Sequence, residues 1–116
     1  MREQRENGRI VPAQQPKGKL MLHVNDDRFE VRSVRDVSPF GIGVCIVNDV
    51  EKESEVRLCY QSEDEELEVP GIVVWSGSIK GDGNTQTIPL FRIGICFQAD
   101  NVAGNLEFYR LMRDKD

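Results

Sequence analysis

Several absences in the sequence narrow what the protein can be. Its 116 residues contain no run of about 18 apolar residues, so no transmembrane helix is predicted. The segment Met1–Arg5 lacks the apolar stretch of a secretory signal peptide, so we expect a cytoplasmic protein. Aromatic residues make up only 7%, which disfavours proteins that hold single-stranded nucleic acid by stacking its bases on aromatic side chains.

Cysteine and histidine are too few and too widely spaced for the common metal sites and disulfide frameworks. Cys45, Cys59 and Cys96 form no CxxC pair, and their number is odd. Each lies in an apolar, strand-like run, so we predict three buried, reduced thiols. His23 is the only histidine, a poor basis for a metal centre or a catalytic triad. We therefore predict no metal, no cofactor and no enzymatic activity.

Charge is distributed unevenly along the chain. Residues 1–19 hold five basic and two acidic side chains, whereas residues 20–116 hold ten basic and eighteen acidic ones. An acidic body argues against binding to duplex nucleic acid, because that affinity depends on many phosphate contacts. A short basic arm can still hold a small ligand that carries one or two phosphates.

Hydrophobic periodicity predicts a mostly β protein. Alternating or continuous apolar runs predict strands near 19–24, 28–32, 42–47, 56–60, 67–75 and 90–97. The alternation slips at Ser33–Val34, which indicates a β-bulge just before Asp36. Trp75 ends one of these runs, and we expect it in the core and not in a ligand-binding surface. The acidic run 63–66 is interpreted as a solvated hairpin loop and 76–89 as a long loop.

The C-terminal residues 101–113 change to helical spacing, with Val102, Leu106, Tyr109 and Met112 along one stripe. About six strands in so short a chain are expected to close into a barrel, because closure removes exposed edges. The predicted fold is therefore a six-stranded antiparallel β-barrel with a C-terminal α-helix. We expect residues 1–17 to form a flexible arm and residues 18–116 to form the single folded domain.

Two polar motifs carry the chemistry. The arm holds Arg5 and Arg9 in an RxxxR pattern, and residues 36–41 hold Asp36, Ser38 and Gly41 in a DxSxxG pattern. Arginine can pair with phosphate and with the N7 and O6 acceptors of guanine, and a carboxylate can accept hydrogen bonds from guanine's N–H edge. The alternative for the second motif is a simple turn, in which Asp36 bonds only to nearby backbone amides.

The ordered pair of motifs resembles the PilZ domain family. Val73-Val74-Trp75 and the stretch Phe91–Phe97 are also similar to that family's strand signatures, so the resemblance covers roughly residues 5–110. It implies a β-barrel that binds cyclic di-GMP, a bacterial second messenger. It also implies that Arg5 and Arg9 hold phosphate and guanine, that Asp36 and Ser38 contact a guanine edge, and that Gly41 keeps the turn open.

We therefore predict a switch in signal transduction: the ligand orders the arm, and the new surface engages an unknown downstream protein partner. Such circuits often govern motility, biofilm or exopolysaccharide. Family members often carry another arginine where this chain has Gln4, so both one ligand and a stacked pair of ligands stay open. Two other functions also stay open. One is a degenerate adaptor of the same fold that binds a protein and no nucleotide, and the other is a small barrel for single-stranded nucleic acid.

Overall fold

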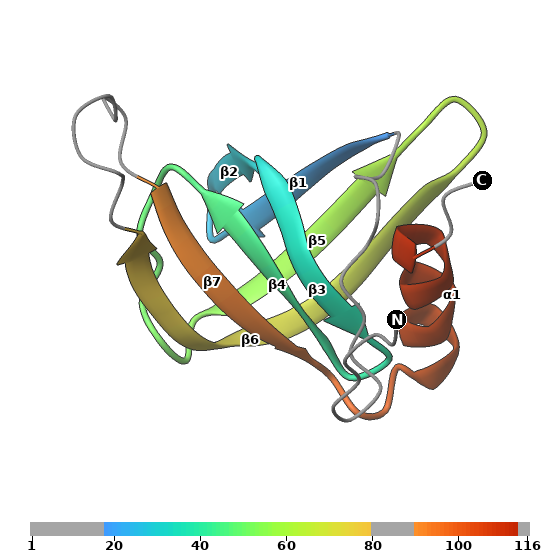
Figure 1. The fold of residues 1–116 in the computed structure, drawn as a ribbon. Coiled ribbons are helices and arrows are strands. Elements are labelled where there is room, and N and C mark those ends of the chain that lie inside the picture. Colours follow the sequence, from blue (N-terminus) through green and yellow to red (C-terminus); the bar gives the residue numbers. More distant parts are fainter. Residues whose placement is uncertain (1–17, 80–89, 114–116) are drawn as a thin grey trace, which may run out of the picture.

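Seven antiparallel strands and one helix make up the described part of the chain. The structure is a computed structural model that describes residues 18–79 and 90–113. Its elements are β1 (Lys19–Val24), β2 (Asp27–Glu30), β3 (Ser33–Ser38), β4 (Gly41–Ile46), β5 (Glu55–Gln61), β6 (Glu66–Ile79), β7 (Leu90–Phe97) and α1 (Val102–Arg113). The strands form one sheet in the order β2-β1-β5-β6-β7-β4-β3, and Figure 1 shows how this sheet curls.

The curled sheet confirms a mostly β fold with a C-terminal helix, but the prediction of a six-stranded closed barrel was wrong. The strand expected at residues 28–32 ends at Glu30, and residues 33–38, for which no strand was predicted, form β3; β2 pairs with β1 and β3 pairs with β4. The amide of Val31 still donates to Leu20 O at 2.9 Å, and that of Arg32 donates to Cys45 O at 2.8 Å. Within the described residues, the result is a curled half-barrel whose two end strands are consecutive in the chain.

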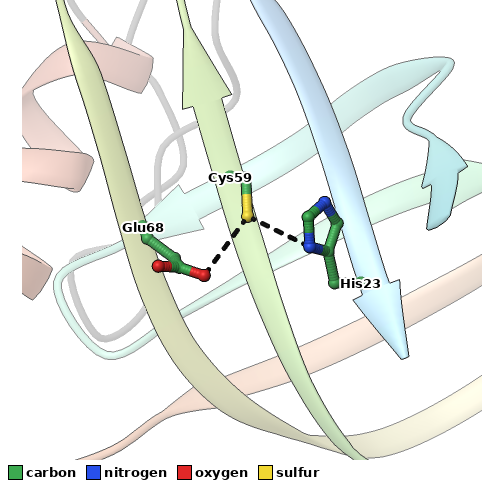
Figure 2. A group of neighbouring side chains, drawn as sticks. All are labelled: His23, Cys59 and Glu68. Atoms are coloured by element: carbon green, nitrogen blue, oxygen red, sulfur yellow. Dashed lines mark hydrogen bonds between the residues drawn. The ribbon is translucent and has the colours of Figure 1, made fainter. Parts of the chain in front are cut away.

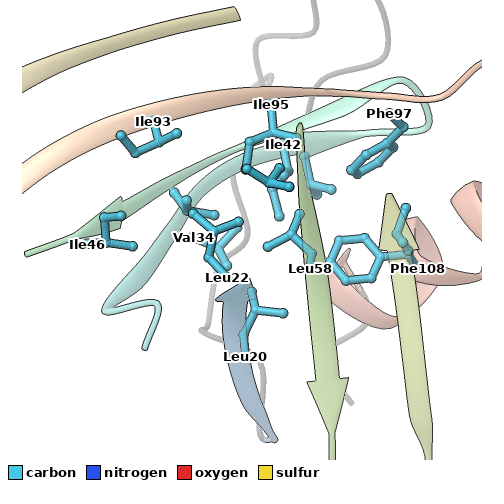
Figure 3. Close-up of a cluster of buried hydrophobic side chains, with 14 of the residues drawn as sticks. Leu20, Leu22, Val34, Ile42, Ile46, Leu58, Ile93, Ile95, Phe97 and Phe108 are labelled. Carbon is cyan, nitrogen blue, oxygen red and sulfur yellow. The ribbon is translucent and has the colours of Figure 1, made fainter. Parts of the chain in front are cut away.

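The concave side of the sheet is filled by alternate residues of its strands. Leu22, Ile42, Leu58 and Ile93 are fully buried there, as expected for strands with one face on a core. Helix α1 covers this core next to β3 and β6 and inserts Phe108, which is also fully buried (Figure 3).

Helix α1 confirms the predicted C-terminal helix and begins directly after Asn101. The Phe108 ring meets Phe97 edge-to-face at 5.6 Å, a favourable geometry for two aromatic rings. Buried Asn105 accepts from Asn101 Nδ2 at 3.0 Å and donates to Gln98 O at 2.8 Å, which ties the helix to the end of β7. Among the described residues, no helix is both long enough and apolar enough to cross a membrane.

The turns agree with the predictions better than the strand ends do. Asn25 has a φ of 57° in the tight β1–β2 turn, a conformation that asparagine tolerates. Residues 63–65 of the acidic run lie in the exposed β5–β6 connection, where Ser62 N donates to Glu65 O at 2.8 Å, and Glu66 begins β6. Strand β6 continues to Ile79, so the segment predicted as a loop from residue 76 begins as strand; residues 80–89 lie outside the described residues.

Of the three cysteines predicted to be buried, only Cys45 is. Cys59 is half-buried, because Leu58 and Tyr60 on either side of it face the core. Cys96 is exposed for the same reason, since Ile95 and Phe97 face inward. Apolar neighbours in the sequence therefore do not predict that a residue is buried when one face of its strand is solvated.

Candidate ligand-binding corner

The DxSxxG motif forms a tight β-hairpin, called here the β3–β4 corner (residues 36–41). Ser38 pairs with Gly41 and Asp36 with Gly43, so only Pro39 and Phe40 form the turn. The segment is thus mostly strand, and not a six-residue turn. The predicted bulge is confirmed, because the β3–β4 register shifts between Val34 and Asp36. Such a bulge re-aims the side chains that follow it.

Ser38 stabilises the turn itself. Its side chain is only 2% exposed, and its Oγ accepts a hydrogen bond from Phe40 N at 3.0 Å. The carbonyl of Phe40 accepts from Phe97 N at 2.9 Å, which fixes the turn to β7. The Phe40 side chain points away and is 68% exposed. The hydroxyl hydrogen of Ser38 remains available as a donor, because its oxygen acts as the acceptor within the turn.

Gly41 is required by the packing of the sheet. A Cβ built at this position would run into the carbonyl oxygen of Ile95 on the neighbouring strand β7. Its φ lies outside the left-handed region, so close backbone approach, and not positive φ, explains the glycine. The motif glycine therefore has a structural reason that is independent of any ligand.

Asp36 belongs to a lateral row that crosses four strands of the sheet. The row runs from Asp36 on β3 through Gly43 on β4 and Gly94 on β7 to Trp75 on β6. A Cβ built at Gly43 would lie 3.0 Å from Asp36 Oδ1, so the carboxylate leans over this glycine. The two central positions have no side chains and are both buried, because the Asp36 carboxylate covers Gly43 and the Trp75 ring covers Gly94.

Trp75 overturns the expectation that it lies in the core. Its side chain is 42% exposed, and its ring lies across Gly94, where any Cβ would overlap it. The cause is a register shift between Val73 and Trp75, which leaves Val73 fully buried and turns both Val74 and Trp75 outward. The exposed Arg92 follows on the same face, two positions along β7 from Gly94.

The structure places Asp36, Ser38 and Gly41 together on one hairpin. Arg5 and Arg9, the other predicted site residues, lie outside the described residues. The sequence-based prediction missed Trp75 as a surface residue, because only the bulge in β6 turns it outward. The signal that could have found it is Gly94, since a glycine inside a strand indicates close approach of another group.

Comparison with known proteins identifies the family. A sequence model of the PilZ domain matches residues 3–111 of the 116 residues. The chain belongs to the PilZ domain family. Among solved structures, this PilZ domain is similar to "PilZ domain with c-di-GMP of YcgR from Escherichia coli", with a TM-score of 0.65 and 16% identity. That match covers 95% of this chain and 89% of the other, and it shows a shared fold. Among curated proteins, none matches this chain.

Proposed function

We propose that this protein is a receptor for cyclic di-GMP and not an enzyme. In this proposal, the ligand contacts Arg5, Arg9, Asp36, Ser38 and Gly41. The observation that carries the proposal is the row that crosses β3, β4, β7 and β6. It lays the Asp36 carboxylate over Gly43 and the half-exposed Trp75 indole over the neighbouring Gly94, on one face of the sheet. A flat base can stack on the exposed face of the indole while its edge meets the carboxylate, and a side chain at either glycine would displace one of these two groups.

Each side chain has a stated task in this complex. The Asp36 carboxylate accepts hydrogen bonds from N1–H and N2–H₂ of guanine, and the Ser38 hydroxyl donates to an acceptor on the same base. The Trp75 ring offers a face for stacking. Arg5 and Arg9 pair with the phosphates and with N7 and O6 of guanine, where charge-assisted bonds are strongest. The whole protein is acidic, so the basic residues of segment 1–17 supply most of the local attraction for an anion.

Signalling follows from where these groups lie in the chain. The arm residues and the corner are distant in sequence, so one ligand that touches both holds segment 1–17 against the outer face of the sheet. The held segment and the ligand together form a surface that the free protein lacks, and a downstream protein partner recognises that surface. This is an order–disorder switch of the kind found in other regulatory proteins.

Calorimetric titration tests the proposal. Cyclic di-GMP is titrated into the wild-type protein and into the Arg5→Ala/Arg9→Ala variant. We expect binding in the wild type and a loss of about a hundredfold or more in the variant, because each arginine contributes charge-assisted hydrogen bonds. The charge-matched control is Arg28→Ala/Arg57→Ala, which removes two exposed arginines of β2 and β5 and should bind like the wild type. The stoichiometry distinguishes one ligand from a stacked pair beside Gln4.

Two outcomes would contradict the proposal. Absence of heat with folded wild-type protein would favour the adaptor that binds a protein without nucleotide. Equal weakening in both double variants would mean that only net charge matters, and the arm would then have no specific role. A nucleic-acid-binding barrel would instead bind an oligonucleotide with a steep dependence on salt.

A further inference from the structure

A second group of chemically active side chains lies on the outer face of the sheet, away from the β3–β4 corner. It consists of His23 on β1, Cys59 on β5 and Glu68 on β6. His23 Nδ1 lies 3.6 Å from Cys59 Sγ, and Cys59 Sγ lies 3.7 Å from Glu68 Oε2. The three ligand atoms all lie within 4.8 Å of one another. Figure 2 shows Cys59 on the central strand, with the other two side chains pointing toward it from either side.

The strand register explains why these three residues meet. Cys59 lies directly opposite Glu68 in the β5–β6 ladder, and such cross-strand pairs point to the same face. On its other side Cys59 faces Met21, and His23 is the diagonal neighbour two residues along β1. The positions are held by regular antiparallel ladders in the middle of the sheet, and no loop is needed to bring them together.

The two distances from Cys59 Sγ suit a metal ion. A tetrahedral zinc ion with bonds of about 2.3 Å to sulfur and about 2.0–2.1 Å to nitrogen or oxygen separates its sulfur from each other ligand by roughly 3.5 Å. The two measured separations from Cys59 Sγ are within a few tenths of an ångström of this value. We propose that His23, Cys59 and Glu68 form a binding site for a zinc-like divalent transition metal ion, with a fourth position open to solvent or to an outside ligand.

The donor set favours this class of ion over the hard cations. Imidazole and thiolate select zinc and its neighbours, whereas calcium and magnesium require oxygen ligands. The three residues line a surface hollow together with Met21 and Gln61, so an ion can enter directly from solvent. An open fourth position in such a hollow is typical of sites that bind a further molecule at the metal.

The metal-free site also holds groups that oppose the ion. Lys19 and Arg28 line the same hollow and repel a cation. Arg57 Nε pairs with Glu68 Oε2 at 3.0 Å, but both side chains are more than half exposed, and exposed ion pairs contribute little. Burial and the neighbouring Glu68 carboxylate raise the pKa of Cys59 to about 11, so the metal-free sulfur carries its proton. Binding releases that proton, as for any thiolate ligand.

This metal site is independent of the proposed messenger function. It lies on β1, β5 and the first half of β6, whereas the corner lies on β3 and β4 at the other end of the strand order. If the metal proposal fails, the proposal of cyclic di-GMP binding is unaffected. If cyclic di-GMP does not bind, the metal proposal is unaffected.

Cobalt(II) titration of the tag-free protein tests the site. The buffer is mildly alkaline and contains a phosphine reductant, so that no added thiol competes for the ion. We expect one cobalt ion per chain and a near-ultraviolet sulfur-to-cobalt absorption band, both removed by added zinc. Cys59→Ser should lose the band, and His23→Ala should bind at least about tenfold more weakly. Arg57→Gln should bind more tightly, because Glu68 then has no cationic partner at that position.

Cys96→Ser is the matched control, because Cys96 is an exposed thiol on β7 that donates to the carbonyl of Phe97. It should keep the band and the affinity. Far-ultraviolet circular dichroism checks that each variant is folded, and His23→Ala provides the test if Cys59→Ser is not. A missing band in the wild type, a band that survives Cys59→Ser, or a band lost in Cys96→Ser would each overturn the site.

Discussion

The β3–β4 corner and the His23–Cys59–Glu68 group share one outer surface but are built by different means. The corner is shaped by the backbone, through the bulge before Asp36, the tight turn fixed by Ser38, and the close approach of Gly41 to β7. The metal-binding group depends on side chains projected from regular ladders. Substitutions at the turn and close-packed positions Ser38 and Gly41 should therefore reduce stability, whereas those in the group should change metal binding with little effect on stability.

The largest expected effect on stability is at Gly41. Gly41→Ala should lower the free energy of unfolding by about 3 kcal/mol, because the new methyl group meets a backbone carbonyl that cannot rotate away. Gly77→Ala is the matched control, since nothing lies within 4 Å of a Cβ there. Cys59→Ser, in the metal-binding group, should cost only about 0.5 kcal/mol. Urea unfolding measures all three, and equal costs at Gly41 and Gly77 would contradict the close-packing argument.

Asp36→Ala separates the ligand role of the corner from its turn role. We expect affinity for cyclic di-GMP to fall by about 2 kcal/mol, or roughly thirtyfold, because a charged acceptor for the guanine edge is lost. The melting temperature should stay close to that of the wild type. Asp26→Ala, in the exposed β1–β2 turn, is the control for charge. A large loss of stability in Asp36→Ala, with unchanged affinity, would support the turn-only alternative.

A smaller loss is expected at Trp75. Trp75→Ala should weaken the same ligand by about 1 kcal/mol or somewhat more, the usual scale of one base–aromatic stacking contact. Trp75→Phe should recover part of that loss, since it keeps an aromatic face. Val74→Ala removes an equally exposed neighbour and should leave affinity unchanged. Calorimetry compares the three variants, and equal affinities in Trp75→Ala and wild type would remove the ring from the ligand surface.

The smallest expected effect concerns the Cys59 thiol, where only the rate of alkylation should change. In a Cys96→Ser background with Cys45 buried, alkylation by iodoacetamide reports on Cys59. Because its pKa is raised to about 11, the rate should be low at neutral pH and continue to climb until the pH reaches that value. Glu68→Gln removes a negative charge that disfavours the thiolate, so it should lower this pKa and speed the reaction at neutral pH. An unchanged rate would mean that the Glu68 carboxylate does not raise the pKa of Cys59.

Local patterns in the sequence determined the strand-rich class, the C-terminal helix and the family. Alternation over Val56, Leu58 and Tyr60 and the helical stripe through Phe108 each depend on side-chain spacing within one element. The bulge before Asp36 was also predictable, because it interrupts an alternation that is otherwise regular. The two motifs are short and ordered along the chain, so they too can be read without the fold.

Only the tertiary structure decided which residues face one another across strands. Trp75 turns outward because the β6–β7 register shifts. The strand pairing changes at Val31–Arg32, because β2 pairs with β1 and β3 pairs with β4. His23 meets Cys59 only once β1 and β5, which are distant in sequence, adopt one register. A slip of a single residue would turn one of these side chains to the opposite face. Pairing between distant strands is a property of the whole sheet, and that is why local sequence patterns did not reveal the metal-binding group.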